Sequence, residues 1–260
     1  MIQPVFSIFI PTYNRVNTLL ELLNKIHTLR QKNPEISIEV IVADNASSDK
    51  TFEMMQIAAN NNFIDIYIRR SINMGPDFNM LDCFNYSHSD FVWILCDDDL
   101  PTEDSFLNIF NCINSYGHAI SLIYLNGSTE LMTGEIISER LVEYKEGIES
   151  SKVDILKNVG IELLRASTLV FRKTNSKGFY SKQLGLGKFI APLTLALDAI
   201  ENSNIYIFNQ PQVRYREGDK SSWVANWPVI LRENIPEALS IFCKRNGIDI
   251  NQYNWLEHSS

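Results

Sequence analysis

The chain has 260 residues, a formal net charge of −8 and a hydrophobic share of 45%. This length suffices for one large α/β domain, and the acidic balance argues against a nucleic-acid-binding protein and against a polybasic membrane anchor. The four cysteines lack metal-ligand spacing, no apolar run approaches the ~20 residues of a membrane span, and a strand follows Met1 closely. We therefore expect a cytoplasmic protein without a signal peptide.

Short apolar runs alternate with helical apolar stripes over about the first 125 residues. The pattern predicts helices between strands at 5–10, 38–43, 64–68, 91–96 and 119–125. Such alternation is typical of an α/β fold, with a mostly parallel central sheet and helices on both of its faces.

Local signals predict where these elements begin and end. Pro11 is expected to end the first strand, because proline offers no donor to the ladder. Side-chain N-caps are expected at Asn17 for the first helix, at Ser47 or Ser48 for the second, and at Thr102 for the fourth.

The alternation stops near residue 125, and the second half is predicted to be α+β. We expect two short strands within 129–144, helical turns at 153–164, a strand at 168–171, a helix at 190–201, a strand at 205–208 and a helix at 229–245. No linker rich in proline, glycine and serine separates the halves, so one compact unit is expected.

Three consecutive acids, Asp97, Asp98 and Asp99, follow the apolar run 91–96. They are expected at the carboxyl end of a buried strand, which is the edge of an open α/β sheet where ligands bind. Adjacent carboxylates repel one another and are costly to desolvate, and Mg²⁺ or Mn²⁺ would relieve both costs and bridge two phosphates. The alternative is a solvated acidic turn.

Asp44 ends the second predicted strand, beside an amide and a polar loop. A carboxylate there can accept hydrogen bonds from a base or a ribose, or it can cap the amides of its own loop. The spacing does not favour either role.

Four loop sequences resemble the motifs of family 2 glycosyltransferases. They are residues 7–15 (SIFIPTYNR), 40–49 (VIVADNASSD), 73–75 (NMG) with Asn79, and 93–99 (WILCDDD). Each motif is weak alone, but the four occur in the family's order and spacing over residues 5 to 125.

The resemblance implies a GT-A fold, a nucleotide-sugar donor with a UDP-sugar as the default, Mg²⁺ or Mn²⁺ on the diphosphate, and inversion at the anomeric carbon. Residues 1–125 would form the nucleotide-sugar-binding half. Residues 126–260 would form the acceptor-side half with a C-terminal helical extension.

The resemblance also implies site residues. The nucleotide-binding set is Pro11, Thr12, Tyr13, Arg15, Asp44, Asn73, Gly75, Asn79, Asp97 and Asp98. The metal ligands would be Asp97 and Asp99. Cys96 stands either where the commonest form of the motif has its first aspartate or just before an Asp97-x-Asp99 motif, and we favour the second reading.

The later part of the chain departs from the family pattern. Family members often carry an acidic pair, one of them the general base, at a position that falls near residues 191–192, where this chain has alanine and proline. The catalytic base is therefore unassigned. Asp198 is expected to face solvent, and the late loop at 213–223 lacks the usual histidine, which leaves Glu217 and Asp219 as candidate replacements.

Other functions fit less well. A nucleotidyltransferase would show a glycine-rich basic loop after the first strand, and an oxidoreductase would show Gly-x-Gly-x-x-Gly. A catalytically silent nucleotide- or sugar-binding protein on the same fold remains the alternative. The resemblance favours bacterial surface-polysaccharide synthesis with a glycan or lipid-linked acceptor, which would bring the protein transiently to the inner face of the membrane.

Overall fold

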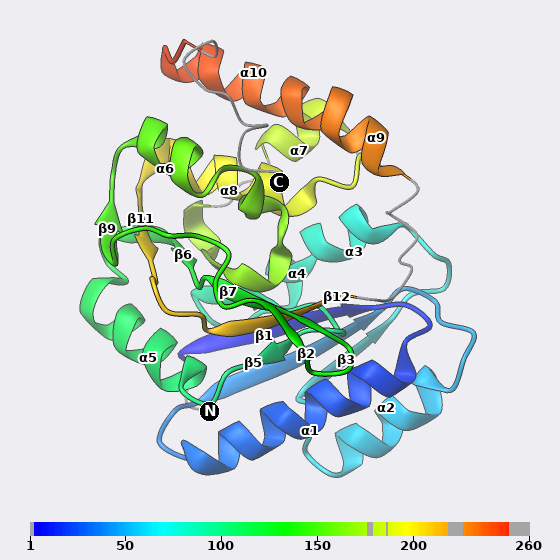
Figure 1. Cartoon of the computed structure of the whole chain (residues 1–260). Helices are drawn as coiled ribbons and strands as arrows, with labels where there is room; N and C mark the ends of the chain where they lie inside the picture. The colour runs from blue at the N-terminus through cyan, green and yellow to red at the C-terminus, as the bar shows by residue number, and fades with distance from the viewer. Residues whose placement is uncertain (1–2, 176–178, 186, 218–225, 250–260) are drawn as a thin grey trace.

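The computed structural model describes residues 3–175, 179–185, 187–217 and 226–249 (Figure 1). Its first part alternates strands and helices, as the sequence predicts. In chain order the elements are β1 (Phe6–Thr12), α1 (Val16–Lys32), β2 (Ile38–Asp44), α2 (Thr51–Asn60), β3 (Ile66–Arg69), α3 (Pro76–Leu81), α4 (Cys83–Tyr86), β4 (Phe91–Ile94), β5 (Leu100–Pro101), α5 (Ser105–Tyr116) and β6 (Ile120–Tyr124).

The second part mixes short strands, helices and 3₁₀ turns, as expected of an α+β half. Its elements are β7 (Gly127–Leu131), β8 (Ile136–Ser138), β9 (Gly147–Glu149), α6 (Lys152–Asn158), η1 (Gly160–Leu164), η2 (Ala166–Thr168), β10 (Leu169–Arg172), η3 (Lys173–Asn175), α7 (Phe179–Leu184), α8 (Ala191–Asn202), β11 (Asn204–Ile207), β12 (Val213–Glu217), α9 (Trp227–Val229), the π-helical turn η5 (Ile230–Asn234) and α10 (Ile235–Asn246).

A central sheet of eight strands runs in the order β3-β2-β1-β4-β10-β6-β11-β9. Strands β3, β2, β1 and β4 are parallel, and β10 pairs antiparallel with both β4 and β6. Strands from the two predicted halves therefore interleave in one sheet. Helices cover both faces, with α1 and α2 below the sheet and α8 and α10 above it in Figure 1, and each face has its own apolar core.

A second sheet, in the order β5-β12-β7-β8, lies against the end of β4. The sequence predicts β7 and β8 as two strands around Thr133-Gly134, but β5, β9 and β12 were not predicted. All three are only two to five residues long, too short to show an alternation of polar and apolar side chains. Strand β12 pairs with β5 on one side and with β7 on the other, which brings residues 213–217 to the turn after β4.

The first strand does not end at Pro11. Strand β1 continues to Thr12, with Pro11 opposite Ala43 and Thr12 opposite Asp44. The ladder between β1 and β4 stops at the pair Phe9 and Ile94, so Pro11 has a strand neighbour on one side only. A proline is tolerated there because no second ladder needs its missing N–H.

The predicted N-caps are also wrong. Asn17 lies inside α1, and neither α2 nor α5 begins with a side-chain cap from Ser47, Ser48 or Thr102. Instead one carboxylate serves two helices. Asp49 Oδ2 accepts from Val16 N at 3.2 Å at the start of α1, and Oδ1 accepts from Thr51 N at 3.0 Å at the start of α2. Sequence spacing detects local caps and misses a cap that arrives from another loop.

Two predicted helices are interrupted. The segment 77–87 forms α3 and α4, with a break at Asp82, whose carboxylate accepts from Arg70 Nη2 at 2.7 Å. The predicted helix at 229–245 begins with α9 and a π-helical turn before the regular α10, which ends at Gly247 in the left-handed conformation, as expected of a C-terminal glycine. Within the described residues, no helix combines the length and the apolar character needed to cross a membrane.

We predict that Asp49→Ala lowers the free energy of unfolding by about 1–2 kcal/mol, because two helix N-termini lose their acceptor. Urea unfolding followed by circular dichroism measures the loss. The matched control is Asn17→Ala, which removes the cap suggested by sequence alone and should change stability by less than about 0.5 kcal/mol. Equal effects from the two substitutions would contradict the shared cap.

Candidate active site

The three acids lie in the turn after β4, at the carboxyl edge of the sheet. Asp97 is buried and accepts from Thr12 Oγ1 at 2.6 Å and from Arg15 Nη1 at 3.1 Å. The same Nη1 also donates to Asp98 Oδ2 at 2.5 Å. The loop after β1 therefore supplies a hydroxyl and a cation to two of the acids, and the predicted residues Thr12, Arg15, Asp97 and Asp98 come together.

Asp99 points to the other side, toward the second half of the chain. Ser167 Oγ, from η2, donates to Asp99 Oδ2 at 2.5 Å, and Arg216 N, from β12, donates to Oδ1 at 3.0 Å. Arg216 also binds the acid turn through its guanidinium, whose Nε donates to the backbone carbonyl of Asp98. Neither Ser167 nor Arg216 was selected from the sequence, because their contacts depend on pairing across 68 and 117 residues.

Burial dominates the electrostatics of this cluster. Desolvation raises the pKa of both Asp97 and Asp99 well above the ordinary aspartate range, and the charge of Asp98 raises both further. Arg15 and Thr12 lower the pKa of Asp97, and Ser167 lowers that of Asp99, without cancelling the effect of burial. Without a bound cation, the site therefore favours the protonated forms of Asp97 and Asp99.

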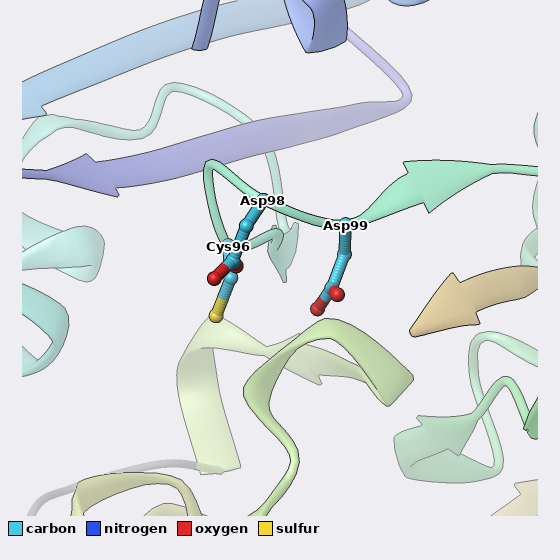
Figure 2. A group of neighbouring side chains, drawn as sticks. All are labelled: Cys96, Asp98 and Asp99. Carbon is cyan, nitrogen blue, oxygen red and sulfur yellow. The ribbon is translucent and has the colours of Figure 1, made fainter. Parts of the chain in front are cut away.

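A second grouping overlaps the acid turn. Figure 2 shows the side chains of Cys96, Asp98 and Asp99, and one ligand atom from each lies within 4.8 Å of the others. Two carboxylates suit Mg²⁺ or Mn²⁺, and a thiol adds affinity for softer ions. Burial, and then the charge of Asp99, raise the pKa of the Cys96 thiol. Asp97, expected beside Asp99 as a metal ligand, does not belong to this group because it faces Thr12 and Arg15.

Asp44 ends β2 and is fully buried, with 0% of its surface exposed. Its Oδ1 accepts from Ser47 N at 2.8 Å, and its Oδ2 accepts from Tyr67 OH at 2.8 Å. Burial, and then the hydrogen bond to Asp44, raise the pKa of Tyr67. In the geometry described here, Asp44 caps its own loop and holds the neighbouring strand.

The Asn-x-Gly segment braces the loop after β2. Asn45 Nδ2 donates to Asn73 Oδ1 at 2.8 Å, and Met74 N donates to Asn45 Oδ1 at 2.9 Å. Gly75 has a φ of +84°, which favours glycine there. Asn79 Nδ2 donates to the carbonyl of Ala43 at 2.8 Å, so Asn79 supports the end of β2.

The remaining predicted nucleotide-binding residues lie at the rim. Pro11 is the penultimate residue of β1, and Tyr13, which follows that strand, is 44% exposed. The ring of Tyr13 is therefore free to meet a ligand.

The acceptor side corrects one expectation and leaves another untested. Asp198 does not face solvent, because it is buried and accepts from Phe179 N at 2.9 Å and Tyr180 N at 3.4 Å at the start of α7. Its neighbours on α8 are also buried, so this helix has no solvated face there. Glu217 ends β12, whereas Asp219 lies outside the described residues.

A carboxylate from the first half reaches the start of α8. Asp77 Oδ2 accepts from Phe189 N at 2.7 Å, and Oδ1 accepts from Ala191 N at 3.1 Å. Phe189 has a φ of +58°, an unusual conformation for a bulky residue, and it is held between these two bonds. Asp77 therefore connects the Asn-x-Gly region to α8, whose own first turn contains no acidic residue.

Comparison with known proteins agrees with this geometry. Structural neighbours show that the fold is of the GT-A type. One is the Staphylococcus aureus TarS 1–349 in complex with UDP-GlcNAc (TM-score 0.63, 16% identity, 92% of this chain and 65% of that one). Another is the mannosyltransferase PcManGT from Pyrobaculum calidifontis in complex with GDP-Man and Mn²⁺ (TM-score 0.54, 17% identity, 88% and 61%).

The model of glycosyl transferase family 2 matches residues 7–137, just over half of the chain, and the chain belongs to this family. Abequosyltransferase RfbV of Salmonella typhimurium strain LT2 is 44% identical over 102 residues, which are 39% of this chain and 30% of that protein. The poly(ribitol-phosphate) β-N-acetylglucosaminyltransferase TarS of S. aureus strain Mu50 is 25% identical over 122 residues. That alignment spans 47% of this chain and 21% of TarS, so both curated relatives are covered for less than a third of their length.

We predict that the metal-free protein loses stability as the pH rises from about 5 to about 8. An unfolded aspartate has a pKa of about 4, and the folded site raises the pKa of Asp97 and Asp99, so the folded protein binds more protons over that range. Mn²⁺ competes with those protons and should raise the melting temperature more at pH 8 than at pH 5.5, by about 3 °C or more.

Calorimetric melting with and without about 1 mM Mn²⁺ measures both effects, because this concentration exceeds the dissociation constant of an ordinary weak site. Asp99→Asn should flatten the pH dependence, whereas Asp90→Asn, on the exposed turn before β4, should leave it unchanged. A metal effect that is equal at the two pH values would contradict the assignment.

Proposed function

We propose that this chain is a metal-dependent, inverting glycosyltransferase that moves a sugar from a nucleotide-sugar donor to a hydroxyl of its acceptor in surface-polysaccharide synthesis. The observation that carries the proposal is the acid turn after β4, which residues from both halves of the chain hold from opposite sides. Membership of the family and the donor complexes of the structural neighbours support it.

The donor diphosphate would lie at the carboxyl edge of the sheet, over the acid turn. A divalent cation held there would neutralise the charge that develops on the leaving diphosphate. The geometry favours Asp98 and Asp99 as its ligands, with Cys96 as a third donor, because ligand atoms of these three residues lie within 4.8 Å of one another. Arg15 holds Asp97 and Asp98 in place and adds positive charge at the same edge.

Transfer with inversion needs a base that takes the acceptor proton, a step typically worth about 10²–10⁴-fold in rate. The first turn of α8 offers no acid of its own, and Asp198 is used as the cap of α7. This favours a second candidate, a catalytically silent nucleotide- or sugar-binding protein on the same fold. Turnover of donor by the purified protein would separate the two functions.

The acceptor would be a glycan or a lipid-linked sugar. A lipid-linked acceptor would bring the protein to the inner face of the membrane only while it works. The support for a polymer acceptor is the name of one relative, a poly(ribitol-phosphate) β-N-acetylglucosaminyltransferase.

We predict that one or more nucleoside diphosphates bind in a Mn²⁺-dependent manner and that Asp98→Asn weakens this binding about tenfold or more, because a metal ligand is lost. Asp98 is the most exposed of the three acids, with 20% of its side chain accessible, so its substitution should leave the fold intact. Isothermal titration calorimetry with UDP, CDP, GDP and ADP measures the affinities, with Asp90→Asn as control. If no diphosphate binds with metal present, the proposal fails.

A further prediction concerns Cys96. If its sulfur is a ligand, Cd²⁺ bound to the wild type should give the ultraviolet charge-transfer absorption of a cadmium–thiolate bond, and Cys96→Ser should abolish the band. Mn²⁺-dependent nucleotide binding should survive this substitution within about threefold, since hard ions prefer the carboxylates. Cys112, which lies on α5 and is buried, provides the control variant Cys112→Ser. A band that persists without Cys96 would place the thiol outside the site.

A further inference from the structure

The groups that a nucleotide would meet lie in a row along the carboxyl edge of the sheet. Neighbouring strands β4, β1, β2 and β3 end in the acid turn, Thr12, Asp44 and Arg69. Neighbouring strands lie about 4.8 Å apart, so β3 stands roughly 14 Å from β4. This is the scale of an extended nucleoside diphosphate. If the diphosphate lies over the acid turn, as the proposed function requires, the base lies over β2 and β3.

Asp44 is poorly placed to select that base. Its side chain has no exposed surface, and each of its oxygens already accepts a hydrogen bond, from Ser47 N and from Tyr67 OH. Each oxygen keeps a second lone pair, but the carboxylate has no exposed surface at which a base N–H could meet it. The selective contact must therefore come from a neighbouring group with exposed polar atoms.

Arg69 is that neighbour. Its side chain is 43% exposed, and its guanidinium carbon lies 4.5 Å from the centre of the Phe52 ring, so the ring supports the guanidinium plane. Nε lies 3.7 Å from Asp44 Oδ2, and Nη2 donates to the carbonyl of Ser47 at 3.3 Å. These contacts use the Nε side of the guanidinium. The Nη1–Nη2 edge has no partner among the described residues for one hydrogen of each nitrogen.

A guanidinium edge presents two parallel N–H donors, which match two adjacent acceptors on a base. Cytosine offers O2 and N3, and guanine offers O6 and N7. Uracil places an N–H donor between its two carbonyl acceptors, and adenine alternates acceptors with its amino group, so neither matches the pair of donors. Lysine carries the same charge without the planar pair of donors.

We propose that Arg69 reads the nucleobase of the donor, and that the site favours a base with two adjacent acceptors, cytosine or guanine, over uracil and adenine. Asp44 is then a positioning residue, which holds Arg69 and Tyr67 rather than the base. This inference rests on the proposed function, because it places the base from the position of the diphosphate. It replaces the UDP-sugar default with a donor activated by CDP or GDP.

The test is calorimetric titration of the wild type with CDP, GDP, UDP and ADP in the presence of Mn²⁺. We expect CDP or GDP to bind about tenfold or more tightly than UDP and ADP, the discrimination typical of a two-donor contact to a base edge. Arg69→Lys should bring the affinities for all four within about threefold of one another while binding UDP as the wild type does.

Arg245→Lys is the matched control. Arg245 also lies over an aromatic ring, that of Phe179 at 4.1 Å, and its Nε also faces a carboxylate, that of Glu201, but it lies on α10 far from the strand ends. This variant should keep the wild-type ranking. Melting temperatures of both variants report whether the fold is intact, and the wild-type ranking tests the proposal without either of them.

Two failures are distinguishable. If UDP or ADP binds as tightly as both CDP and GDP, or if Arg69→Lys keeps the discrimination, the base assignment is overturned and the donor site stands. If none of the four binds with Mn²⁺ present, the donor site itself is overturned, and the base assignment fails with it.

Discussion

The structure is arranged around the cost of placing three adjacent carboxylates at the end of a buried strand. Like charges at this distance repel, and burial raises the free energy of each ionised form. The surrounding chain answers with donors from different elements, including Thr12 and Arg15 on one side and Ser167 and Arg216 on the other. These donors fix the orientation of each acid, but they do not cancel the cost of burial, which a divalent cation bound there would offset.

The same constraint explains how the strand-end loops become rigid. Several of the polar groups that follow β1 and β2 bond to another loop, as Asn14 does through its backbone N–H to Ser47 and as Asp49 does to the first turn of α1. A ligand that enters such a preformed edge orders little of the chain, and so it loses little affinity to conformational entropy. The polar residues that the motifs contain are therefore divided between those that brace the edge, such as Asp44 and Asn79, and those with surface left for a ligand, such as Tyr13 and Arg69.

Much of the fold is accessible from sequence, because the signal is local. Apolar runs and helical stripes predict every parallel strand of the first half and the buried helix α8, within one to three residues. Several of the errors share one cause, which is a contact from a distant part of the chain. Asp49 caps α1 from another loop, Asp198 is buried because α7 packs on it, and β12 is a strand only because β5 and β7 flank it.

The candidate site divides in the same way. The strand-end acids and Arg15 can be found from the sequence because they follow recognisable strands. The partners of Asp99 cannot, since Ser167 and Arg216 belong to short elements with no pattern of their own. A role such as that of Asp44 depends on burial, and a motif specifies the residue type without saying which of its oxygens are already bonded.

The position of β10 has a consequence for how this protein can be divided. Strands β4 and β6 both belong to the segment that matches the family model, yet they do not pair with each other, because β10 lies between them and bonds to both. A fragment cut after residue 137 would leave two pieces of sheet with unpaired edges in place of one continuous sheet. Such edges are templates for self-association, so we expect that residues 7–137, which match the family model, do not fold as an independent unit.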